Sequence, residues 1–568
     1  MLEAATMPYW LRLEEGTGRW LKRCPDAEEL LDRNAVVSCE KPDEEHDCVT
    51  IMSVVARSVV KPRPPKSVYK CRGLGCSRDV RCFSNTTGNV LKALDERLFR
   101  SKQVGGLLPT IKPTTDVDGR LSPFRVRLLR HLDVNPPLTD DQFVSRYSGG
   151  KKLRYQRAAE SLRTRPLEER DSFLSYFIKY ESHLKQFACP RGINPRDPRY
   201  NVCLGKLIAH NEKNVFNAIR RVWKGHTVLK GMDALKQAAA IVEMTEDVAS
   251  HGDGWVAFMS DASRFDQHVS LEALQFEHTI WPHTVPSQNR AELRELLRMQ
   301  LVNSIRATTD THTVTATVIG GRMSGDMNTS SGNCIIMCAM MWIFCDELGV
   351  RNARLANNGD DCVLIVPRRY ETLILERIST WFTEFGFTMA TEKPVYEIEH
   401  IEFCQSHPVQ SARGWIMVRN PSTSIIKDIT AKTDVRNPVI FSRWLDGVRK
   451  GGLALTDGVP VLHQFYQCFA PSDKTLRTES HAARQIEDSG LGRLSRGLSY
   501  RELPITAESR ASFAMAFGIT PDEQRILERN LSQLVLMAGP IVGHDRNKTL
   551  PEPIVRESTN FLVDSVVK

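Results

Sequence analysis

Residues 357–365 read Asn-Asn-Gly-Asp-Asp-Cys-Val-Leu-Ile, so two adjacent carboxylates stand between a glycine and an apolar run. The run 362–366 predicts a buried strand, and Gly359 suits the turn before it. Asp360 and Asp361 are then expected at the tip of a hairpin, where two neighbouring carboxylates stay ionised at low cost only if cations bind them. A solvated turn is the alternative, because Gly-Asp pairs are common in turns.

A further pair of acids lies upstream in residues 255–266, which read Trp-Val-Ala-Phe-Met-Ser-Asp-Ala-Ser-Arg-Phe-Asp. An apolar strand is expected to end on Asp261, and Asp266 follows near the start of a helix expected at 271–280. Strands that end in acids can bring carboxylates to one edge of a sheet, and such oxygen ligands suit Mg²⁺ or Mn²⁺. Two such ions about 4 Å apart are the usual arrangement for in-line phosphoryl transfer. As an alternative role, Asp266 caps the N-terminus of that helix.

A loop rich in Gly, Ser and Asn separates the two acidic segments. Residues 320–333 read Gly-Gly-Arg-Met-Ser-Gly-Asp-Met-Asn-Thr-Ser-Ser-Gly-Asn, and the small residues allow the backbone to approach a ligand closely. Ser324, Thr329 and Asn333 offer hydroxyls and an amide that can hydrogen-bond a sugar. The apolar segment 334–345 predicts a buried helix after the loop. A flexible loop without a ligand is the alternative.

Taken in order, Asp-x4-Asp, Ser-Gly-x3-Thr-x3-Asn and Gly-Asp-Asp resemble the palm motifs of viral RNA-dependent RNA polymerases. The residues within these motifs most resemble those in the polymerases of tombusvirus-like plant viruses, including umbraviruses. The resemblance also covers Pro-Arg-Asp-Pro-Arg-Tyr-Asn-Val at 195–202 and Ile-Glu-Phe-Cys-Gln at 401–405. It implies an α+β right-hand fold with fingers, a palm made of an antiparallel sheet with helices, and a mostly helical thumb.

The same resemblance divides the chain into four parts. Residues 1–66 are an acidic N-terminal region with a Pro-rich linker, and residues 67–250 are fingers with an NTP-entry motif. Residues 251–410 are the palm with the catalytic motifs, and residues 411–568 are the thumb and C-terminal region. The first part does not resemble the polymerase core, which fits the readthrough or frameshift origin that is common in this virus group.

The resemblance also assigns the catalytic and nucleotide-binding residues. Asp261, Asp360 and Asp361 are the expected catalytic and metal-binding residues for two Mg²⁺ or Mn²⁺ ions, with Asp361 as an outer ligand. At the incoming nucleotide it places Lys179, Lys185, Arg191, Asp266, Ser324, Thr329 and Asn333. Arg191 is the strongest candidate for the triphosphate, because a guanidinium binds phosphate oxygens bidentately.

Two weaker assignments follow the palm motifs. Lys393 could protonate pyrophosphate as a general acid, with a solvent-exposed lysine as the alternative. Cys404 and Gln405 fall where the family has its primer-grip hairpin, so the role expected for them is positional.

Charge is distributed unevenly along the 568 residues, whose formal net charge is only +8. Residues 1–50 carry twelve acids against six Lys and Arg, whereas residues 151–230 carry eighteen Lys and Arg against seven acids. A concentrated basic block beside an acidic site suits a protein that binds polyanions, here template and nascent RNA and NTPs. A solvated charged surface is the alternative for the block.

Cysteine usage and hydropathy limit the cellular compartments in which the protein is expected. The fourteen cysteines include no Cys-x2-Cys pair, and those at 334, 338, 345 and 362 are expected to be reduced and buried, as in an intracellular protein. Zinc at Cys71, Cys76 and Cys82 is a minor alternative with non-standard spacing. No apolar stretch has transmembrane length. The resemblance to the polymerases of positive-strand RNA viruses implies the host cytoplasm, at membrane-associated viral replication complexes reached through a membrane-anchored viral replicase partner.

Three functions fit these patterns unequally. RNA-dependent RNA synthesis is the leading hypothesis. A reverse transcriptase shares the paired acids but usually has a bulky residue in the place of Asp266. A non-enzymatic RNA-binding replication factor would explain the basic block and leave Asp261, Asp360 and Asp361 without a role. The sequence has no phosphate-binding loop of the Gly-x4-Gly-Lys-Ser/Thr type and no nucleophile elbow, so no helicase or protease activity is predicted.

Overall fold

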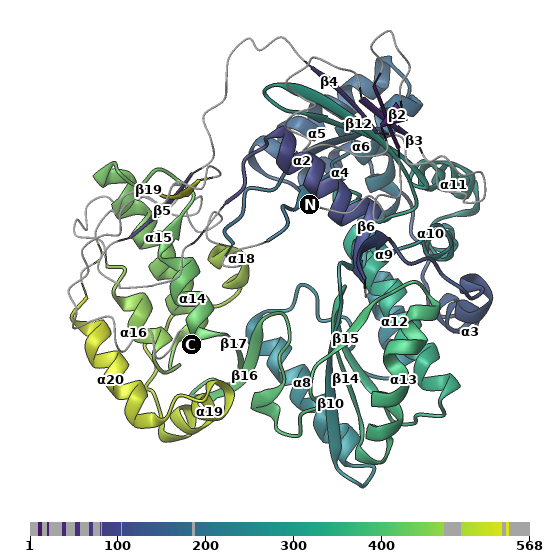
Figure 1. The fold of residues 1–568 in the computed structure, drawn as a ribbon. Coiled ribbons are helices and arrows are strands. Elements are labelled where there is room, and N and C mark those ends of the chain that lie inside the picture. The colour runs from purple at the N-terminus through teal and green to yellow at the C-terminus, as the bar shows by residue number, and fades with distance from the viewer. Residues whose placement is uncertain are drawn as a thin grey trace.

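The computed structural model describes most of the chain between residues 82 and 536. The described residues are 82–103, 105–183, 188–470, 490–534 and 536, with short segments at 10–13, 20–21, 37–40, 52–56, 67–71, 80 and 541–544. Helices and sheets are mixed along these residues, as in an α+β fold (Figure 1).

The strands predicted around the acids form one antiparallel sheet. Its order is β13 (Arg354–Asn358), β14 (Asp361–Pro367), β10 (Trp255–Ala262) and β15 (Met389–Thr391). Every neighbouring pair in this sheet is antiparallel. The two predicted strands are therefore confirmed, and they are direct neighbours.

Both faces of this sheet are buried. On β10, Val256 and Phe258 belong to the same core as α12 (Thr329–Glu347) and α13 (Glu371–Glu384). Ala257 and Met259, which alternate with them, pack with residues of α8 (Ala234–Ala249). Figure 1 shows α8 and the α12–α13 pair on either side of the strands. Because side chains alternate along a strand, two covered faces require the continuous apolar runs seen in the sequence.

A second, larger sheet joins segments that lie far apart in the sequence. Its order is β2-β1-β3-β4-β12-β11-β8-β9, and β11 pairs with β8 in parallel. The strands are β1 (Trp10–Leu13), β2 (Trp20–Leu21), β3 (Val37–Glu40), β4 (Met52–Ala56), β8 (Leu174–Ile178), β9 (Gly192–Ile193), β11 (Val302–Thr308) and β12 (His312–Ile319). Helix α2 (Thr87–Leu94) packs against this sheet through Val90 and Leu94.

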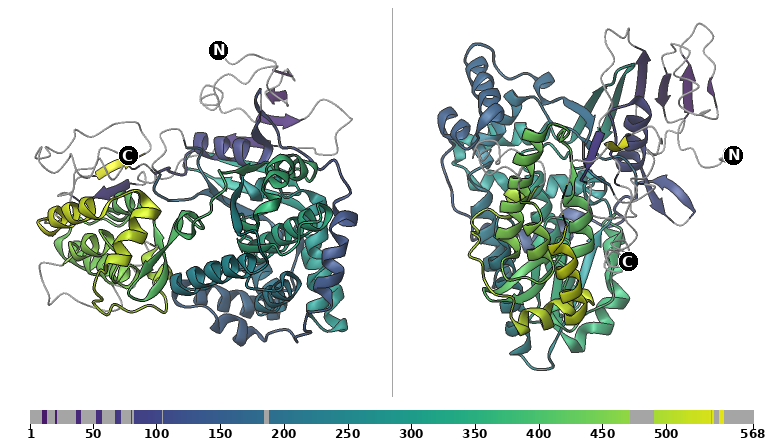
Figure 2. Two further views of the ribbon diagram at one scale, coloured as in Figure 1. Left: turned by 90° about the horizontal axis from the view of Figure 1, so that it is seen from below. Right: turned by 90° about the vertical axis from the view of Figure 1, so that its left-hand side faces the viewer.

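The C-terminal region is mostly helical, as predicted. After the hairpin β16 (Ser406–Ser411) and β17 (Gly414–Arg419), its helices gather to one side of the β10–β14 sheet (Figures 1 and 2). They are α14 (Pro421–Asp428), α15 (Pro438–Thr456), α16 (Leu462–Gln467), α18 (Leu491–Leu494), α19 (Ala507–Phe517) and α20 (Pro521–Ser532). Trp444, Phe465 and Tyr466 are fully buried there, so these aromatics are core residues of the region.

A small sheet links residues 67–70 to this C-terminal region. Strand β5 (Ser67–Lys70) pairs with β18 (Thr430–Ala431) and with β19 (Ile541–His544). A separate hairpin joins β6 (Arg100–Gln103) and β7 (Gly106–Pro109). The three boundaries between the four parts expected from the sequence stay predictions, because long-range pairing crosses them.

The remaining helices surround the two sheets. They are α3 (Val117–Leu129), α4 (Asp140–Ser145), α5 (Gly149–Thr164), α6 (Pro198–Ile208), α7 (Glu212–Trp223), α9 (Phe265–His268), α10 (Leu271–His278) and α11 (Arg290–Arg298). Ser270 caps α10, because its side chain accepts from Ala273 N at 3.2 Å. The alternative role of Asp266 as the cap of this helix is therefore wrong, and Asp266 lies inside α9.

The cysteine predictions are confirmed where the structure describes them. Cys334, Cys338, Cys345 and Cys362 are buried free thiols. Cys76 lies outside the described residues, so a zinc site with Cys71 and Cys82 is untested at that position. Among the described helices, none is both long and apolar enough to span a lipid bilayer.

Candidate active site

The acidic residues meet at one end of the four-stranded sheet. Asp261 of β10 is the direct cross-strand partner of Asp361, the first residue of β14. The hairpin between β13 and β14 turns through Gly359 and Asp360, and Gly359 has a φ of +88°. Two-residue hairpin turns need such a positive φ, which a glycine adopts without strain. The expected hairpin tip with its adjacent acids is therefore confirmed.

Buried amides hold this turn in place. Asn357 is fully buried; its amide donates to Gly359 O at 2.8 Å, and its carbonyl oxygen accepts from Gly359 N at 3.2 Å. Asn358 donates to the sulfur of Cys404 at 3.1 Å. The two asparagines that precede the acids thus fix the position of Asp360 relative to the sheet and to the next hairpin.

The three carboxylates of this end interact electrostatically. All three residues are exposed on the surface. Local crowding by protein, followed by the negative charges of Asp360 and Asp261, raises the pKa of Asp361 to about 6. Hard oxygen donors that repel one another in this way fit divalent cations, which relieve the repulsion. Within the described residues, no three His, Cys, Asp or Glu side chains are arranged in this structure as a metal-binding group.

A polar pair lies beside the acids. Asn333, in the first turns of α12, donates to Asp266 Oδ1 at 2.7 Å. Burial raises the pKa of Asp266, and the negative charge of Asp360 adds to this, while Asn333, Arg322 and Arg191 act in the opposite direction. Groups from three other segments, at 191, 322–333 and 360, therefore act on one carboxylate. The pairing of Asp266 with Asn333 that the sugar hypothesis requires is confirmed as a contact.

The loop before α12 is bound to the segment that follows β9. Asn194 Oδ1 accepts from Ser324 N at 2.8 Å, and its amide lies 2.8 Å from the sulfur of Met323. The Ser324 hydroxyl also donates to Asn194. Thr329 donates to Met323 O at 2.6 Å. The hydroxyls of Ser324 and Thr329 thus hold the loop in this structure.

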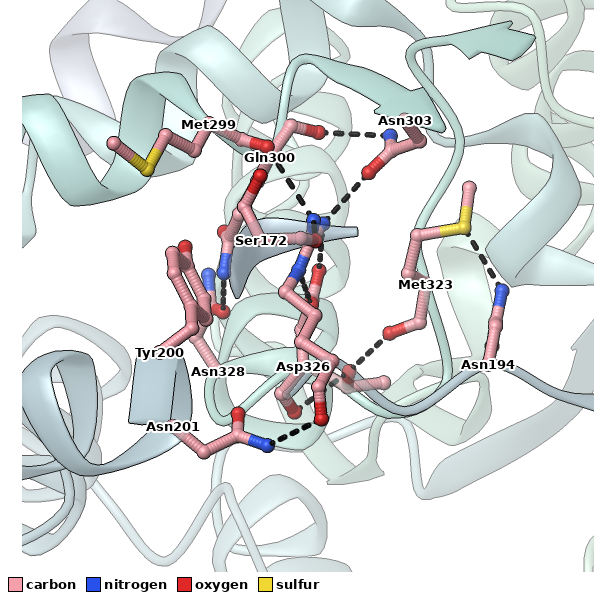
Figure 3. Close-up of polar contacts among 12 residues, drawn as sticks. Ser172, Asn194, Tyr200, Asn201, Met299, Gln300, Asn303, Met323, Asp326 and Asn328 are labelled. Atoms are coloured by element: carbon pink, nitrogen blue, oxygen red, sulfur yellow. Dashed lines mark hydrogen bonds and ion pairs between the residues drawn. The ribbon is translucent and has the colours of Figure 1, made fainter. Parts of the chain in front are cut away.

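A buried ion pair completes this junction, as Figure 3 shows around Asp326. Arg196 pairs with Asp326, and their side chains are 1% and 3% exposed. Arg196 also donates to Asn303 Oδ1 at 2.6 Å and to Ser172 O at 2.7 Å. Every arm of the guanidinium is satisfied by these partners, which a buried arginine requires.

Gly325 allows the loop to approach this segment closely, which leads to a stability prediction. A Cβ at Gly325 would lie 2.5 Å from Asn194 O and 2.5 Å from Pro195 Cα, both backbone atoms. We expect Gly325→Ala to lower the free energy of unfolding by ~1–3 kcal/mol, because overpacking displaces backbone. Urea unfolding measures this, with Gly150→Ala as control since no atom lies within 4 Å of its Cβ. Equal stability of Gly325→Ala and wild type would show that the loop does not need this contact.

The predicted triphosphate residues meet at an unpredicted acid. Lys179 Nζ lies 2.6 Å from Glu181 Oε2, and Arg191 Nε lies 3.6 Å from Glu181 Oε1. Backbone pairing brings the two cations together, because Lys179 N donates to Arg191 O at 2.7 Å. Burial opposes the charge of Glu181, yet Lys179 and Arg191 outweigh it and lower its pKa. Lys185 lies outside the described residues.

The two weaker assignments lie near the acids. Lys393 is exposed and follows β15, the strand that pairs Ala390 with Asp261. Cys404 and Gln405 form a tight turn with φ values of +54° and +59°, closed by the hydrogen bonds between Phe403 and Ser406. Cys404 contacts the Asp360 hairpin through Asn358. The structure thus places Cys404 and Gln405 beside the acidic hairpin and Lys393 farther along β10, between residues that bond Met259 and Ala257, without testing their roles.

The basic block 151–230 has two kinds of cation. Arg196 and Arg199 are buried in ion pairs with Asp326 and Asp171. On α5 the basic side chains are exposed, and they are Lys151, Lys152, Arg154, Arg157 and Arg163. Only part of the charge excess can therefore meet a polyanion.

Sequence reasoning missed several residues of this region. Asn194 carried no motif of its own, and Glu181 lay in the segment of the NTP-entry motif without an assigned role. Asn194 bonds Ser324, which is distant in the sequence, whereas Glu181 pairs with Lys179 and Arg191 of its own region. Arg196 lay within a quoted motif, where a buried arginine looks the same as one that binds RNA. An acid between two basic residues, as at Glu181, was the one local signal that could have been used.

Comparison with known proteins identifies the family. The family model described as viral RNA dependent RNA polymerase matches residues 53–539. The RNA-directed RNA polymerase of Tobacco necrosis virus (strain D) is 38% identical over 474 residues, which cover 83% of this chain and 65% of that protein. That of Tomato bushy stunt virus (strain Cherry) is 41% identical over 463 residues, or 81% of this chain and 55% of that protein.

A third relative agrees with these two. The RNA-directed RNA polymerase of Turnip crinkle virus is 36% identical over 482 residues, which cover 84% of this chain and 61% of that protein. The chain thus spans between about half and two thirds of the length of the relatives it matches. Since the family model covers most of the sequence, the chain belongs to the family of viral RNA dependent RNA polymerases.

Proposed function

We propose that this chain is an RNA-directed RNA polymerase that replicates a positive-strand viral genome from NTPs. The observation that carries the proposal is the cross-strand pairing of Asp261 with Asp361, beside Asp360 and the Asp266–Asn333 pair. Family membership and the names of the relatives support it. A phosphoryl-transfer site and a sugar-binding site at one sheet end suit nucleotide addition.

The proposal includes a right-hand layout. The antiparallel β10–β14 sheet serves as the palm, the larger sheet with its helices as fingers, and the helical C-terminal region as the thumb. Figures 1 and 2 support this layout, since the helical group lies to one side of the sheet that carries the acids. In this layout the template and the nascent strand lie between the helical C-terminal region and the part with the two sheets, and they contact the exposed cations of the basic block.

Asp261, Asp360 and Asp361 are the proposed ligands of two Mg²⁺ or Mn²⁺ ions. When bound, such ions acidify the attacking 3′-hydroxyl and neutralise the triphosphate. The chain itself positions the carboxylates through the β10–β14 register and the Asn357 bonds. In this proposal Arg191 and Lys179 exchange Glu181 for the triphosphate, because a triphosphate carries more negative charge than one carboxylate and offers both cations acceptor oxygens at once.

The Asp266–Asn333 pair favours ribonucleotides over the reverse transcriptase alternative. A carboxylate and an amide at this position can hydrogen-bond a 2′-hydroxyl, whereas exclusion of ribose requires bulk. Localisation at membrane-associated replication complexes in the host cytoplasm, through a membrane-anchored viral replicase protein, stays a prediction from the family resemblance.

One assay tests the proposed function. Purified protein is given a short RNA, with and without a primer, and either NTPs or dNTPs in the presence of Mg²⁺ or Mn²⁺. We expect template-dependent incorporation of NTPs that chelation abolishes. RNA binding without incorporation under any of these conditions would favour the RNA-binding factor, and equal use of dNTPs would favour the reverse transcriptase.

A second prediction concerns the basic block. If its exposed cations contact single-stranded RNA, the affinity for RNA should fall by about 0.7 log units per tenfold increase in salt for each phosphate that is neutralised.

Arg191→Ala should raise the apparent KM for NTP about tenfold, because a charge-assisted bond is lost. The same variant should weaken RNA binding by a smaller factor. Arg170→Ala is the matched control, because its side chain is 61% exposed and that of Arg191 is 54% exposed. A larger loss of RNA affinity than of NTP use would place Arg191 on the template path.

A further inference from the structure

A second buried pair lies behind Asp266 and Asn333. Arg322, in the loop before α12, and Glu277, in α10, both have fully buried side chains. The two terminal nitrogens of Arg322 each lie 3.2 Å from Glu277 Oε2. A buried ion pair of this kind is stable only if its remaining donors and acceptors also find partners.

Those partners are present on the Glu277 side. Trp281 Nε1 and Asn328 Nδ2 donate to Glu277, the latter at 3.0 Å. Asn328 Oδ1 in turn accepts from Gln300 at 2.9 Å. Both carboxylate oxygens of Glu277 are thus bonded, so the carboxylate has one orientation and holds Arg322 in one position.

The remaining nitrogen of Arg322 determines how Asn333 is oriented. Arg322 Nε donates to Asn333 Oδ1 at 3.0 Å, and Asn333 Nδ2 donates to Asp266 Oδ1 at 2.7 Å. A guanidinium has only donors and an ionised carboxylate only acceptors, so the oxygen of the amide must face Arg322 and its nitrogen must face Asp266. The reversed amide would set a nitrogen against a donor and an oxygen against a carboxylate.

A glycine makes room for this arrangement. A Cβ at Gly332, in the first turn of α12, would lie 2.5 Å from a terminal nitrogen of Arg322 and 3.0 Å from Cδ of Glu277. Any larger residue must displace the pair or the helix. The start of α12, where Asn333 follows Gly332, is therefore packed directly on the Arg322–Glu277 pair.

We propose that Arg322, held by Glu277, is a positioning residue that orients the Asn333 amide and thereby sets the preference for ribo- over deoxyribonucleotides. The inference rests on the proposed polymerase function. In this orientation both hydrogens of Asn333 Nδ2 point away from Arg322: one is bonded to Asp266, and the other can be donated to a sugar hydroxyl. Arg322 itself is fully buried and acts only through Asn333.

The test compares Arg322→Lys with wild type in NTP and dNTP incorporation. Lysine keeps the charge opposite Glu277 but lacks the Nε donor, so the amide loses the bond that orients it. We expect the ratio of kcat/KM for NTP over dNTP to fall about five- to tenfold, the effect of one buried hydrogen bond. The loss should come mainly from the NTP arm, because the deoxynucleotide has no 2′-hydroxyl to lose.

Two further measurements separate positioning from general damage. In an Asn333→Ala background, Arg322→Lys should leave the NTP/dNTP ratio unchanged, because its route to the sugar is gone. Arg413→Lys is the control: Arg413 and Asp457 are a buried pair, 7% and 0% exposed, in the C-terminal region. That variant should resemble Arg322→Lys in stability and keep the wild-type ratio.

Each outcome decides the inference. An unchanged ratio in folded Arg322→Lys, with a lowered ratio in Asn333→Ala, overturns it and leaves the proposed function intact. If Asn333→Ala keeps the wild-type NTP/dNTP ratio, both the sugar role of Asn333 and the inference about Arg322 are wrong. If the wild-type protein incorporates no nucleotide, the proposed polymerase function itself is wrong.

If Arg322→Lys does not fold, the double variant Glu277→Leu with Arg322→Met replaces the ion pair by apolar residues. The same fall in ratio is then expected, and a wild-type ratio overturns the inference.

Discussion

Replacing Asp360 by asparagine is expected to lower kcat for nucleotide incorporation by ~10³-fold or more. Asp360 stands at the tip of the β13–β14 hairpin, next to the cross-strand pair of Asp261 and Asp361. Asparagine keeps the shape of the turn but removes one negative charge from the proposed ion ligands. Asp261→Asn should have an effect of the same size, because it removes a carboxylate from the neighbouring strand.

Single-turnover incorporation on a primed RNA measures this loss, and filter binding measures RNA affinity, which should change little. Asp253→Asn is the matched control, since Asp253 precedes the other end of β10 and pairs with Arg369 on the surface. Increasing the Mg²⁺ or Mn²⁺ concentration should restore part of the activity of Asp360→Asn and none of any loss in the control. Near-normal activity of Asp360→Asn would remove Asp360 from the proposed site.

The parts of the fold that were predictable depend on local pattern. The strand segments 255–259 and 362–366 are continuous apolar runs, and the structure buries both of their faces. The helix expected at 334–345 begins earlier, at Thr329, because the polar residues of its first turns are buried as well. Such runs predict burial reliably and element boundaries less well.

Long-range pairing was not predictable from those patterns. Strand β12 pairs with β4, so residues 312–316 lie beside residues 52–56. The hydrogen bonds of a ladder are between backbone atoms, and no side-chain spacing in one segment specifies a partner so distant. The same limit explains why residues 67–70 pair with the C-terminal region.

The candidate site shows the same division between local and distant information. The meeting of Asp261, Asp360 and Asp361 at one end of the sheet could be predicted because each acid stands at the end of an apolar run, and their order resembles the palm motifs of the family. The bond of Ser324 with Asn194 and the ion pair of Glu181 with Arg191 depend on which segments meet in the fold. A polar residue in a loop is equally suited to a ligand and to a neighbouring loop, and only the tertiary contact distinguishes the two.

Asp266→Ala is expected to narrow the preference for NTP over dNTP by roughly ten- to a hundredfold, because a lost bond with an unpaired partner costs ~1–3 kcal/mol. The loss should fall on NTP efficiency, since the proposed partner is the 2′-hydroxyl. Asn333→Ala should act in the same direction. The effect of the double variant on the NTP/dNTP ratio should be less than additive, because Asn333 donates directly to Asp266 at 2.7 Å.

The measurement is kcat/KM for matched NTP and dNTP, with Glu272→Ala, a change at an exposed residue, as the control. A wild-type enzyme that uses dNTPs as well as NTPs, or an Asp266→Ala variant with the wild-type ratio, would contradict this role and reopen the reverse transcriptase alternative.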